Sequence, residues 1–200
     1  MILSIDTTSE FGSIALTEAN VVVEEVELQS PDGFGHVLFG HIQHLLEKRG
    51  TTVYQMECFA AASGPGSFTG VRVGLAAAKG LAEATGKRMV AVSNLRALAS
   101  FGTAPLRATV IDARRGEVYG AVYNSRLELV MPETVLKLEN WLPTLPAGCE
   151  LISTIGAPRA LAAAIGHIAW DEFTPGRASD PADIDANYVR RSDAELFWKE

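Results

Sequence analysis

The hydrophobic and polar positions of residues 1–100 predict three strands followed by alternating helices and strands. Three short apolar or alternating runs come first, and Glu18-Ala19-Asn20 between the second and third is a hairpin signal. After a Pro-Asp-Gly break, apolar residues recur at helical spacing, and glycines close the helices. The elements expected in this half are strands at Ile2–Ile5, Gly12–Thr17, Val21–Leu28, Cys58–Ala62 and Met89–Val92, and helices at Phe34–Arg49, Phe68–Ala84 and Leu95–Ser100.

The second half repeats this pattern in outline. The strand expected at Ala108–Ile111 ends in Asp112, just as the first strand of the chain ends in Asp6. Two hairpin-like strands and a helix follow, and a loop rich in Pro, Asp and Gly precedes a short C-terminal helix. The strands are expected at Glu117–Tyr123 and Leu127–Val130, the helix at Ala157–Ile165 and the loop at Thr174–Asp185.

The repeat predicts an α/β fold built from two related lobes. Glycine and proline cluster at Phe101–Pro105, so the boundary between the lobes is expected there. The expected domains are an N-terminal α/β lobe at residues 1–101, which would carry partner-binding helices, and a smaller C-terminal lobe at residues 102–200 with the C-terminal helix.

The composition is that of an ordinary globular protein. Of the 200 residues, 48% are hydrophobic and 20% are charged, which allows a large core without disulfides or metals. The 24 acidic and 17 basic residues give a net charge of −7, so the chain alone is a poor match for a phosphate backbone. Cys58 and Cys149 are isolated thiols, and Met1–Asp6 has no signal-peptide pattern. With no apolar stretch long enough for a bilayer, we expect a soluble, cytoplasmic protein.

The strongest local motif is the glycine-rich segment from Ser63 to Gly70, between an expected strand and an expected helix. Glycines allow close backbone approach, and a helix N-terminus attracts anions. The motif lacks the Lys-Ser/Thr pair of a P-loop and the glycines that flank the serine of a nucleophile elbow. Two interpretations stay open: a tight strand-to-helix turn with Ser67 as N-cap, or an anion or nucleotide contact. The second interpretation would use Gly64, Gly66, Ser67 and Thr69.

Small residues line the helix that follows this loop. Gly70, Gly74 and Ala78 are four residues apart, and each interior glycine costs about 1 kcal/mol relative to alanine, which close packing of another element could offset. That element is either the chain's own sheet or a helix of a partner. For the partner interpretation, the candidate contact residues of the two long helices are Val37, Leu38, His41, Ile42, Leu45, Gly70, Val71, Gly74, Ala77, Ala78 and Leu81.

The residues that could carry catalysis or bind a metal do not form a recognisable set. His41 and His44 are three apart, but no third ligand stands at a typical spacing, so we expect neither a metal nor a cofactor. Asp6 and Asp112 end equivalent strands, where nucleotide-hydrolysing folds place magnesium ligands, yet capping of the following turn explains Asp6 at least as well. Around Asp112 the pair Arg114-Arg115 is either part of a partner-facing ion-pair network or of a solvated turn.

Seven motifs in a fixed order resemble the TsaB, or YeaZ, family. The most specific is Gly64-Pro65-Gly66-Ser67-Phe68-Thr69-Gly70-Val71-Arg72-Val73-Gly74. The others are Ile5-Asp6-Thr7-Thr8, Ala78-Lys79-Gly80-Leu81-Ala82, Val92-Ser93-Asn94-Leu95, Ala97-Leu98-Ala99, Asp112–Tyr119 and Tyr188-Val189-Arg190. The resemblance spans nearly the whole chain. It departs from the family pattern at His36-Val37, where His-Ser is usual, and at Asn187, where proline or leucine is common.

The resemblance implies an actin/Hsp70/sugar-kinase-like (ASKHA) fold whose second lobe is reduced. It also implies a role in making tRNA threonylcarbamoyladenosine (t6A), in a complex with the catalytic paralogue TsaD and the ATPase TsaE, which uses threonylcarbamoyl-AMP made by a separate enzyme. In such a complex the first two helices would bundle with TsaD, and tRNA would be reached only through the complex. No membrane association is implied.

The resemblance further implies that this subunit has no catalytic residues of its own. TsaD-like proteins hold their catalytic metal with a His-x-x-x-His pair, and the corresponding segment here, Val92–Ala99, has no histidine. Alone, the chain would form a homodimer through the same helices. The alternatives are an independent ATP-dependent phosphotransferase of the same fold or a glycoprotease-like metallopeptidase.

Overall fold

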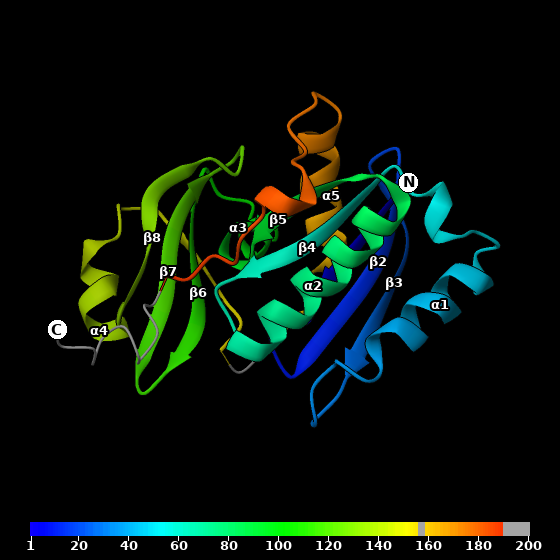
Figure 1. Ribbon diagram of the computed structural model, residues 1–200. Helices are drawn as coiled ribbons and strands as arrows, with labels where there is room; N and C mark the ends of the chain where they lie inside the picture. The colour runs from blue at the N-terminus through cyan, green and yellow to red at the C-terminus, as the bar shows by residue number, and fades with distance from the viewer. Residues whose placement is uncertain (156–158, 190–200) are drawn as a thin grey trace, which may run out of the picture.

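Two β-sheets lie side by side in the computed structural model, which describes residues 1–155 and 159–189 (Figure 1). The first sheet has the strand order β3-β2-β1-β4-β5 and the second has the order β8-β7-β6-β9. The strands of the first sheet are β1 (Ile2–Asp6), β2 (Phe11–Glu18), β3 (Val21–Gln29), β4 (Cys58–Gly64) and β5 (Arg88–Ser93). Those of the second are β6 (Leu106–Arg114), β7 (Glu117–Asn124), β8 (Leu129–Lys137) and β9 (Glu150–Ser153).

The second sheet repeats the pairing of the first four strands. In the first sheet β1 pairs antiparallel with β2, with Ile5 opposite Ile14, and parallel with β4. In the second sheet β6 pairs antiparallel with β7, with Val110 opposite Gly120, and parallel with β9. The predicted α/β fold of two related lobes is therefore confirmed. The second sheet has four strands against five in the first, so the second lobe is reduced.

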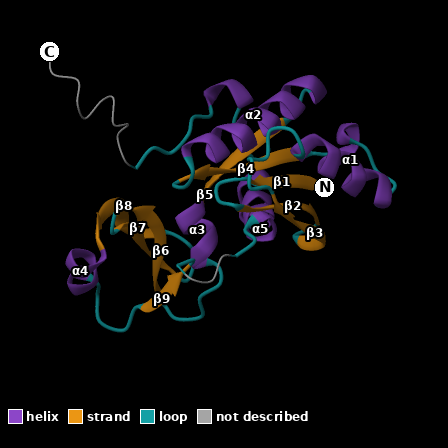
Figure 2. Cartoon of the chain, turned by 90° about the horizontal axis from the view of Figure 1, so that it is seen from below, coloured by secondary structure: helices purple, strands orange, loops and turns teal. Residues whose placement is uncertain are grey.

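Helices cover both faces of the first sheet (Figure 2). On one face lie α1 (Leu38–Lys48) and α2 (Phe68–Thr85), and on the other lies α5 (Ala162–Phe173). The remaining helices are α3 (Asn94–Ala99), α4 (Leu138–Trp141) and the 3-10 helices η1 (Val53–Gln55), η2 (Leu142–Thr144) and η3 (Pro181–Asp183). The sequence predicted α1, α2 and α3, although α1 starts at Leu38 because residues 34–37 form a turn.

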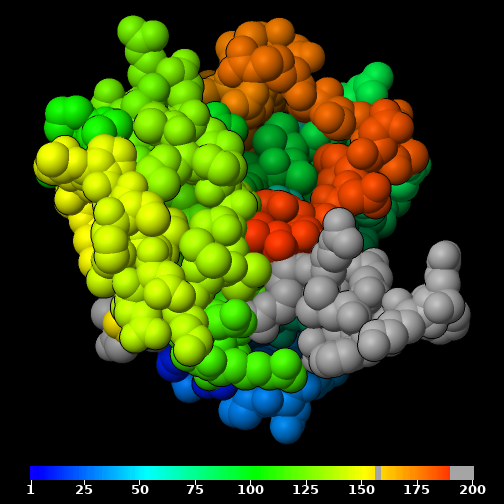
Figure 3. Space-filling model, turned by 90° about the vertical axis from the view of Figure 1, so that its left-hand side faces the viewer, coloured from blue at the N-terminus to red at the C-terminus, as the bar shows by residue number. Residues whose placement is uncertain are grey.

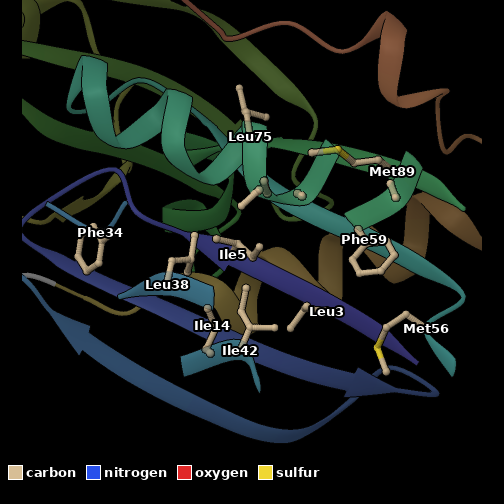
Figure 4. Packing of buried hydrophobic residues seen from close by; sticks show 14 of the residues in the cluster. Leu3, Ile5, Ile14, Phe34, Leu38, Ile42, Met56, Phe59, Leu75 and Met89 are labelled. Carbon is tan, nitrogen blue, oxygen red and sulfur yellow. The ribbon is translucent and has the colours of Figure 1, made fainter. Parts of the chain in front are cut away.

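The hydrophobic core is split by the first sheet into two layers. Figure 4 shows the layer under α1 and α2, where Leu3 and Ile5 of β1 meet Leu38 and Ile42 of α1 and Leu75 of α2. All five residues of β1 are buried, because helices cover both of its faces. The central strand of this lobe therefore buries its polar residues, Ser4 and Asp6, together with its apolar ones.

The predicted extent of the second lobe, residues 102–200, is wrong for the chain after β9. Helix α5 packs on β1, β2, β4 and β5 of the first sheet. Beyond it, the backbones of Ser179 and Met89 exchange two hydrogen bonds of 2.9 and 3.0 Å, and Ile184 joins the core of the first lobe. The bare face of the first sheet has to be covered, and the apolar α5 covers it.

Two further expectations concern the C-terminal part of the chain. The helix expected at Ala157–Ile165 begins at Ala162 and continues to Phe173, and residues 156–158 lie outside the described residues. The loop expected at Thr174–Asp185 contains η3. The short helix expected at the C-terminus falls largely in residues 190–200, which also lie outside the described residues.

Candidate functional site

The glycine-rich loop joins β4 to α2 and turns the chain back onto the end of β1. Ser67 is the N-cap of α2, and its hydroxyl accepts a hydrogen bond of 3.3 Å from the backbone N–H of Gly70. The backbone N–H of Ser67 donates to the carbonyl of Thr8 at 2.7 Å. Gly64 adopts a φ of +102°, which a glycine tolerates without strain. The N-cap predicted for Ser67 is confirmed.

Three glycines of this motif allow α2 to lie directly on the turn after β1. A Cβ on Gly66 would sit 2.7 Å from the carbonyl oxygen of Thr8, and one on Gly70 would sit 2.0 Å from that of Thr7. A Cβ on Gly74 would meet the Thr7 hydroxyl at 2.7 Å. In addition, the Thr7 hydroxyl donates to the Gly70 carbonyl at 2.7 Å. The close approach offered by these glycines is thus used within the chain, as the tight-turn interpretation expects.

The prediction that the candidate contact residues of α1 and α2 meet a partner is wrong for the buried ones. They pack within the chain's own first lobe: those of α1 belong to its hydrophobic core, and the 70/74/78 stripe is the face of α2 that meets β1 and β4. The buried members are Leu38, Ile42, Leu45, Gly70, Val71, Gly74, Ala77 and Ala78. Among the other candidates, His41 is exposed, Val37 and Leu81 are half-buried, and a partner contact for them stays a prediction.

A second row of positions on α2 faces outward. Arg72, Ala76 and Gly80 are four residues apart and exposed, and we call them the outer row. A Cβ on Gly80 would have nothing within 4 Å. On α1 the exposed positions include Gly40, which is equally open, and Phe39, whose side chain is 54% exposed. No sequence motif singled out this row, although Ala76 and Gly80 have the same small-residue spacing as the buried stripe.

A buried polar group ties the end of β1 to the start of α3. Thr8 donates to one oxygen of the Asp6 carboxylate with its backbone N–H at 3.0 Å and with its hydroxyl at 2.6 Å. The Asn94 side chain donates to the Thr8 hydroxyl and accepts the Gly64 N–H at 2.9 Å. Burial raises the pKa of Asp6, and the hydrogen bonds from Thr8 oppose that shift. Asp6 therefore caps its own turn.

Asp112 occupies the equivalent place in the second lobe, and it also caps its own turn, although it is exposed to solvent. Its carboxylate accepts the backbone N–H of Arg114 at 2.8 Å. Arg114 is 3.7 Å from Asp112 and 3.9 Å from Glu10 of the first lobe, and both ion pairs are solvent-exposed. Exposed pairs of this kind contribute little to stability, typically about 0–1 kcal/mol.

A cleft of about 1080 Å³ lies between the two lobes. Its lining comes from the turn after β1, the glycine-rich loop, the β6–β7 hairpin and the chain around Tyr188. Of the predicted anion-contact residues, Ser67 and Thr69 are exposed at its edge, Gly66 is half-buried and Gly64 is buried.

Glu133 joins the two lobes beside this cleft. Its carboxylate on β8 accepts hydrogen bonds from the Ser93 hydroxyl of the first lobe, the Tyr123 hydroxyl at 2.7 Å and the Asn187 amide at 2.6 Å. Figure 3 shows the chain around Asn187, in red, wedged between the second lobe and the rest of the first. Burial is the larger cause of a raised pKa of Tyr123, and the Glu133 carboxylate is the second, so the Tyr123 hydroxyl keeps its proton and remains a donor. No sequence motif pointed to this junction.

Within the described residues, no cluster of three or more His, Cys, Asp or Glu side chains is arranged to hold a metal ion. In that same part of the chain, no helix has the length and apolar character needed to cross a membrane.

Comparison with known proteins decides the family. The sequence model described as "TsaD: tRNA N6-adenosine threonylcarbamoyltransferase" matches residues 35–164. The tRNA threonylcarbamoyladenosine biosynthesis protein TsaB of Bacillus subtilis is 30% identical over 224 aligned positions, which cover 100% of this chain and 98% of that protein. The chain belongs to the TsaB (YeaZ) family.

Other relatives agree with this assignment. TsaB of Escherichia coli is 39% identical over 126 residues, 61% of this chain and 54% of that protein, so the match spans about half of the relative. The crystal structure described as "YeaZ from Pseudomonas aeruginosa" superposes with a TM-score of 0.79 at 24% identity, covering 94% of this chain and 98% of that one. At that identity the superposition shows the shared fold, and the sequence matches show the family.

Proposed function

We propose that this chain is a non-catalytic subunit in the biosynthesis of tRNA threonylcarbamoyladenosine. It would bind a TsaD-like catalytic subunit through the outward faces of α1 and α2 and work with a TsaE-like ATPase in the cytoplasm. The observation that carries the proposal is the outer row of α2, a strip of an arginine and two small residues on an 18-residue helix of a TsaB-family chain. Such a strip allows a second helix to approach closely.

The non-catalytic part of the proposal rests on how the polar residues near the cleft are used. The segment expected to correspond to the histidine pair of TsaD-like proteins, Val92–Ala99, has no histidine and includes Ser93 and Asn94. The Ser93 hydroxyl accepts backbone N–H groups at the start of α3, and Asn94 holds the glycine-rich loop and Thr8. These side chains are occupied by structural hydrogen bonds, which supports a scaffold role. The net charge of −7 supports contact with tRNA only through the complex.

The same faces would form a homodimer when the catalytic subunit is absent. Phe39 on α1 and Phe68 on α2 are 54% and 50% exposed, and covering such side chains is favourable. A patch suited to a paralogue can meet its own copy about a two-fold axis, so the homodimer and the complex should exclude each other. Ser67 and Thr69 stay available at the cleft edge for an anion or nucleotide.

Size-exclusion chromatography with a charge placed in the outer row tests the docking surface. Ala76→Glu should leave the circular dichroism spectrum unchanged, because Ala76 is exposed, and should prevent co-elution with the catalytic subunit. Burying that carboxylate unpaired would cost several kcal/mol, on the order of 3–5. Ala147→Glu, the same change at an exposed position of the second lobe, is the matched control. Co-elution of the Ala76→Glu variant would contradict this docking surface, and turnover of ATP or peptide by the chain alone would favour the enzyme alternatives.

A further inference from the structure

Arg72, at the N-terminal end of the outer row, stacks on the Phe68 ring and is hydrogen-bonded to the hydroxyl of Tyr188. Its guanidinium carbon lies 3.6 Å from the centre of the Phe68 ring and 5.9 Å from that of the Tyr188 ring. Its Nε donates a hydrogen bond of 3.0 Å to the Tyr188 hydroxyl. The two rings are 5.7 Å apart, and Tyr188 is 116 positions from Arg72 along the chain. An arginine that is exposed to solvent is thus fixed by contacts from a distant segment.

The segment that carries Tyr188 is itself anchored. The backbone N–H of Asn187 donates to the Ser63 carbonyl at 2.7 Å, and its side chain donates to Glu133 at 2.6 Å. Two neighbouring elements, the end of β4 and strand β8, therefore set the position of the Tyr188 ring. Because arginine normally has about 2 kcal/mol of rotamer entropy to lose when it is immobilised, holding it in advance lowers the cost of binding through it.

Among the described residues, nothing pairs with the outward part of the Arg72 guanidinium, which is exposed. Stacking and the bond from Nε leave the two terminal amino groups, and across residues 1–155 and 159–189 no acidic side chain forms an ion pair with Arg72. A planar fork of parallel N–H donors matches the two oxygens of a carboxylate. Arginine and aromatic residues are also the types that dominate the binding energy of protein interfaces.

We propose that Arg72 is the polar anchor of the docking surface and pairs with an Asp or Glu carboxylate of the protein partner. Phe68 and Tyr188 are its positioning residues. This inference rests on the proposed function, since it places Arg72 one helical turn from Ala76 on the same exposed row. The alternative occupant of the fork is a phosphate of tRNA. A single arginine on a chain of net charge −7 neutralises too few phosphates to hold RNA, so the carboxylate is favoured.

Isothermal titration calorimetry of the full chain against the catalytic subunit from the same genome tests the anchor. Arg72→Lys keeps the charge but loses the fork and the stacking, and it should weaken binding about tenfold or more. Tyr188→Phe keeps the ring and removes only the hydroxyl that orients Nε, and it should weaken binding about threefold. Arg88→Lys is the control, because Arg88 is likewise exposed and pairs only with Asp180 among the described residues. That control should bind like the wild type.

The outcomes separate this inference from the proposed function. If Arg72→Lys binds within twofold of the wild type while Ala76→Glu does not bind, Arg72 is not an anchor and the docking surface stands. If the wild type itself does not bind, the proposed function fails and the anchor with it. If Arg72→Lys keeps the protein partner but loses retardation of tRNA in a gel, the fork serves RNA and the carboxylate assignment is overturned.

Discussion

Replacing Gly70 by alanine should destabilise the chain, although alanine is the better helix former. The added Cβ would lie 2.0 Å from the carbonyl oxygen of Thr7, 3.0 Å from its carbonyl carbon and 3.2 Å from the Cα of Thr8. All three are backbone atoms, so α2 or the turn after β1 must move. Overpacking of this kind costs about 1–3 kcal/mol, and the hydrogen bond from the Thr7 hydroxyl to Gly70 would add about 1 kcal/mol if it broke.

The helix-propensity gain of about 1 kcal/mol offsets only part of this cost. We therefore expect a net loss of roughly 1–3 kcal/mol in the free energy of unfolding, measured by urea denaturation as a lower midpoint at an unchanged slope. A thermal melt should fall by about 2–4 °C for each kcal/mol lost.

Gly80→Ala on the same helix is the matched control. Nothing lies within 4 Å of its added Cβ, so only the propensity term applies and the variant should be more stable by about 0.5–1 kcal/mol. The two substitutions are chemically identical and should have opposite signs. If Gly70→Ala stabilised the chain as Gly80→Ala does, the close packing of α2 on the turn after β1 would be refuted.

Two further perturbations test the polar groups around the cleft. Glu133→Ala removes the acceptor of three hydrogen bonds, so the chain should lose about 2 kcal/mol of stability. Amide hydrogen exchange should become faster in β8 and at residues 186–189. Glu139→Ala, at an exposed position, is the control and should change neither stability nor exchange. Unchanged exchange in Glu133→Ala would show that the lobes are held by other contacts. Asp6→Asn tests the buried carboxyl. Burial raises the pKa of Asp6 in the folded chain above the unfolded value of about 3.9. The contribution of Asp6 to stability is therefore fully present below the unfolded pKa and is lost as the pH rises through the folded pKa. The free energy of unfolding of Asp6→Asn minus that of the wild type should therefore increase with pH from about 4 upward, and a difference that stayed flat or fell in urea titrations would contradict the burial of a charged Asp6.

Periodicity predicted the elements well because most of them are made by local patterns. The strands of the first sheet, β6 and β7 of the second, the three helices of the first hundred residues and the N-cap at Ser67 follow from apolar spacing and from glycine positions. Strand β9 was not predicted, and β8 extends to Lys137 rather than ending at Val130. The same reasoning could not assign the faces of α2. Positions 70, 74 and 78 and positions 72, 76 and 80 are both spaced by one helical turn and both contain small residues. Only the atoms next to Gly70 and Gly80 tell which row meets the sheet.

Long-range pairing was the other part that the sequence could not supply. Ala157–Ile165 looked like an element of the second lobe, yet α5 returns to the first sheet, where Ser13 and Glu25 of neighbouring strands accept its first backbone N–H groups. The contacts of Glu133 span 40 and 54 positions to Ser93 and Asn187. No local pattern marks a glutamate as the acceptor for two other segments, so this junction appears only in three dimensions.

Formation of t6A in a reconstituted mixture tests the central claim most directly. The mixture would hold the catalytic subunit, the ATPase, threonylcarbamoyl-AMP and unmodified tRNA, and the modified nucleoside would be quantified by mass spectrometry. With the wild-type chain or Ala147→Glu, t6A should accumulate, and without the chain or with Ala76→Glu it should fall to background. Equal t6A in the presence and absence of the chain, or t6A made by the chain without the catalytic subunit, would contradict the account.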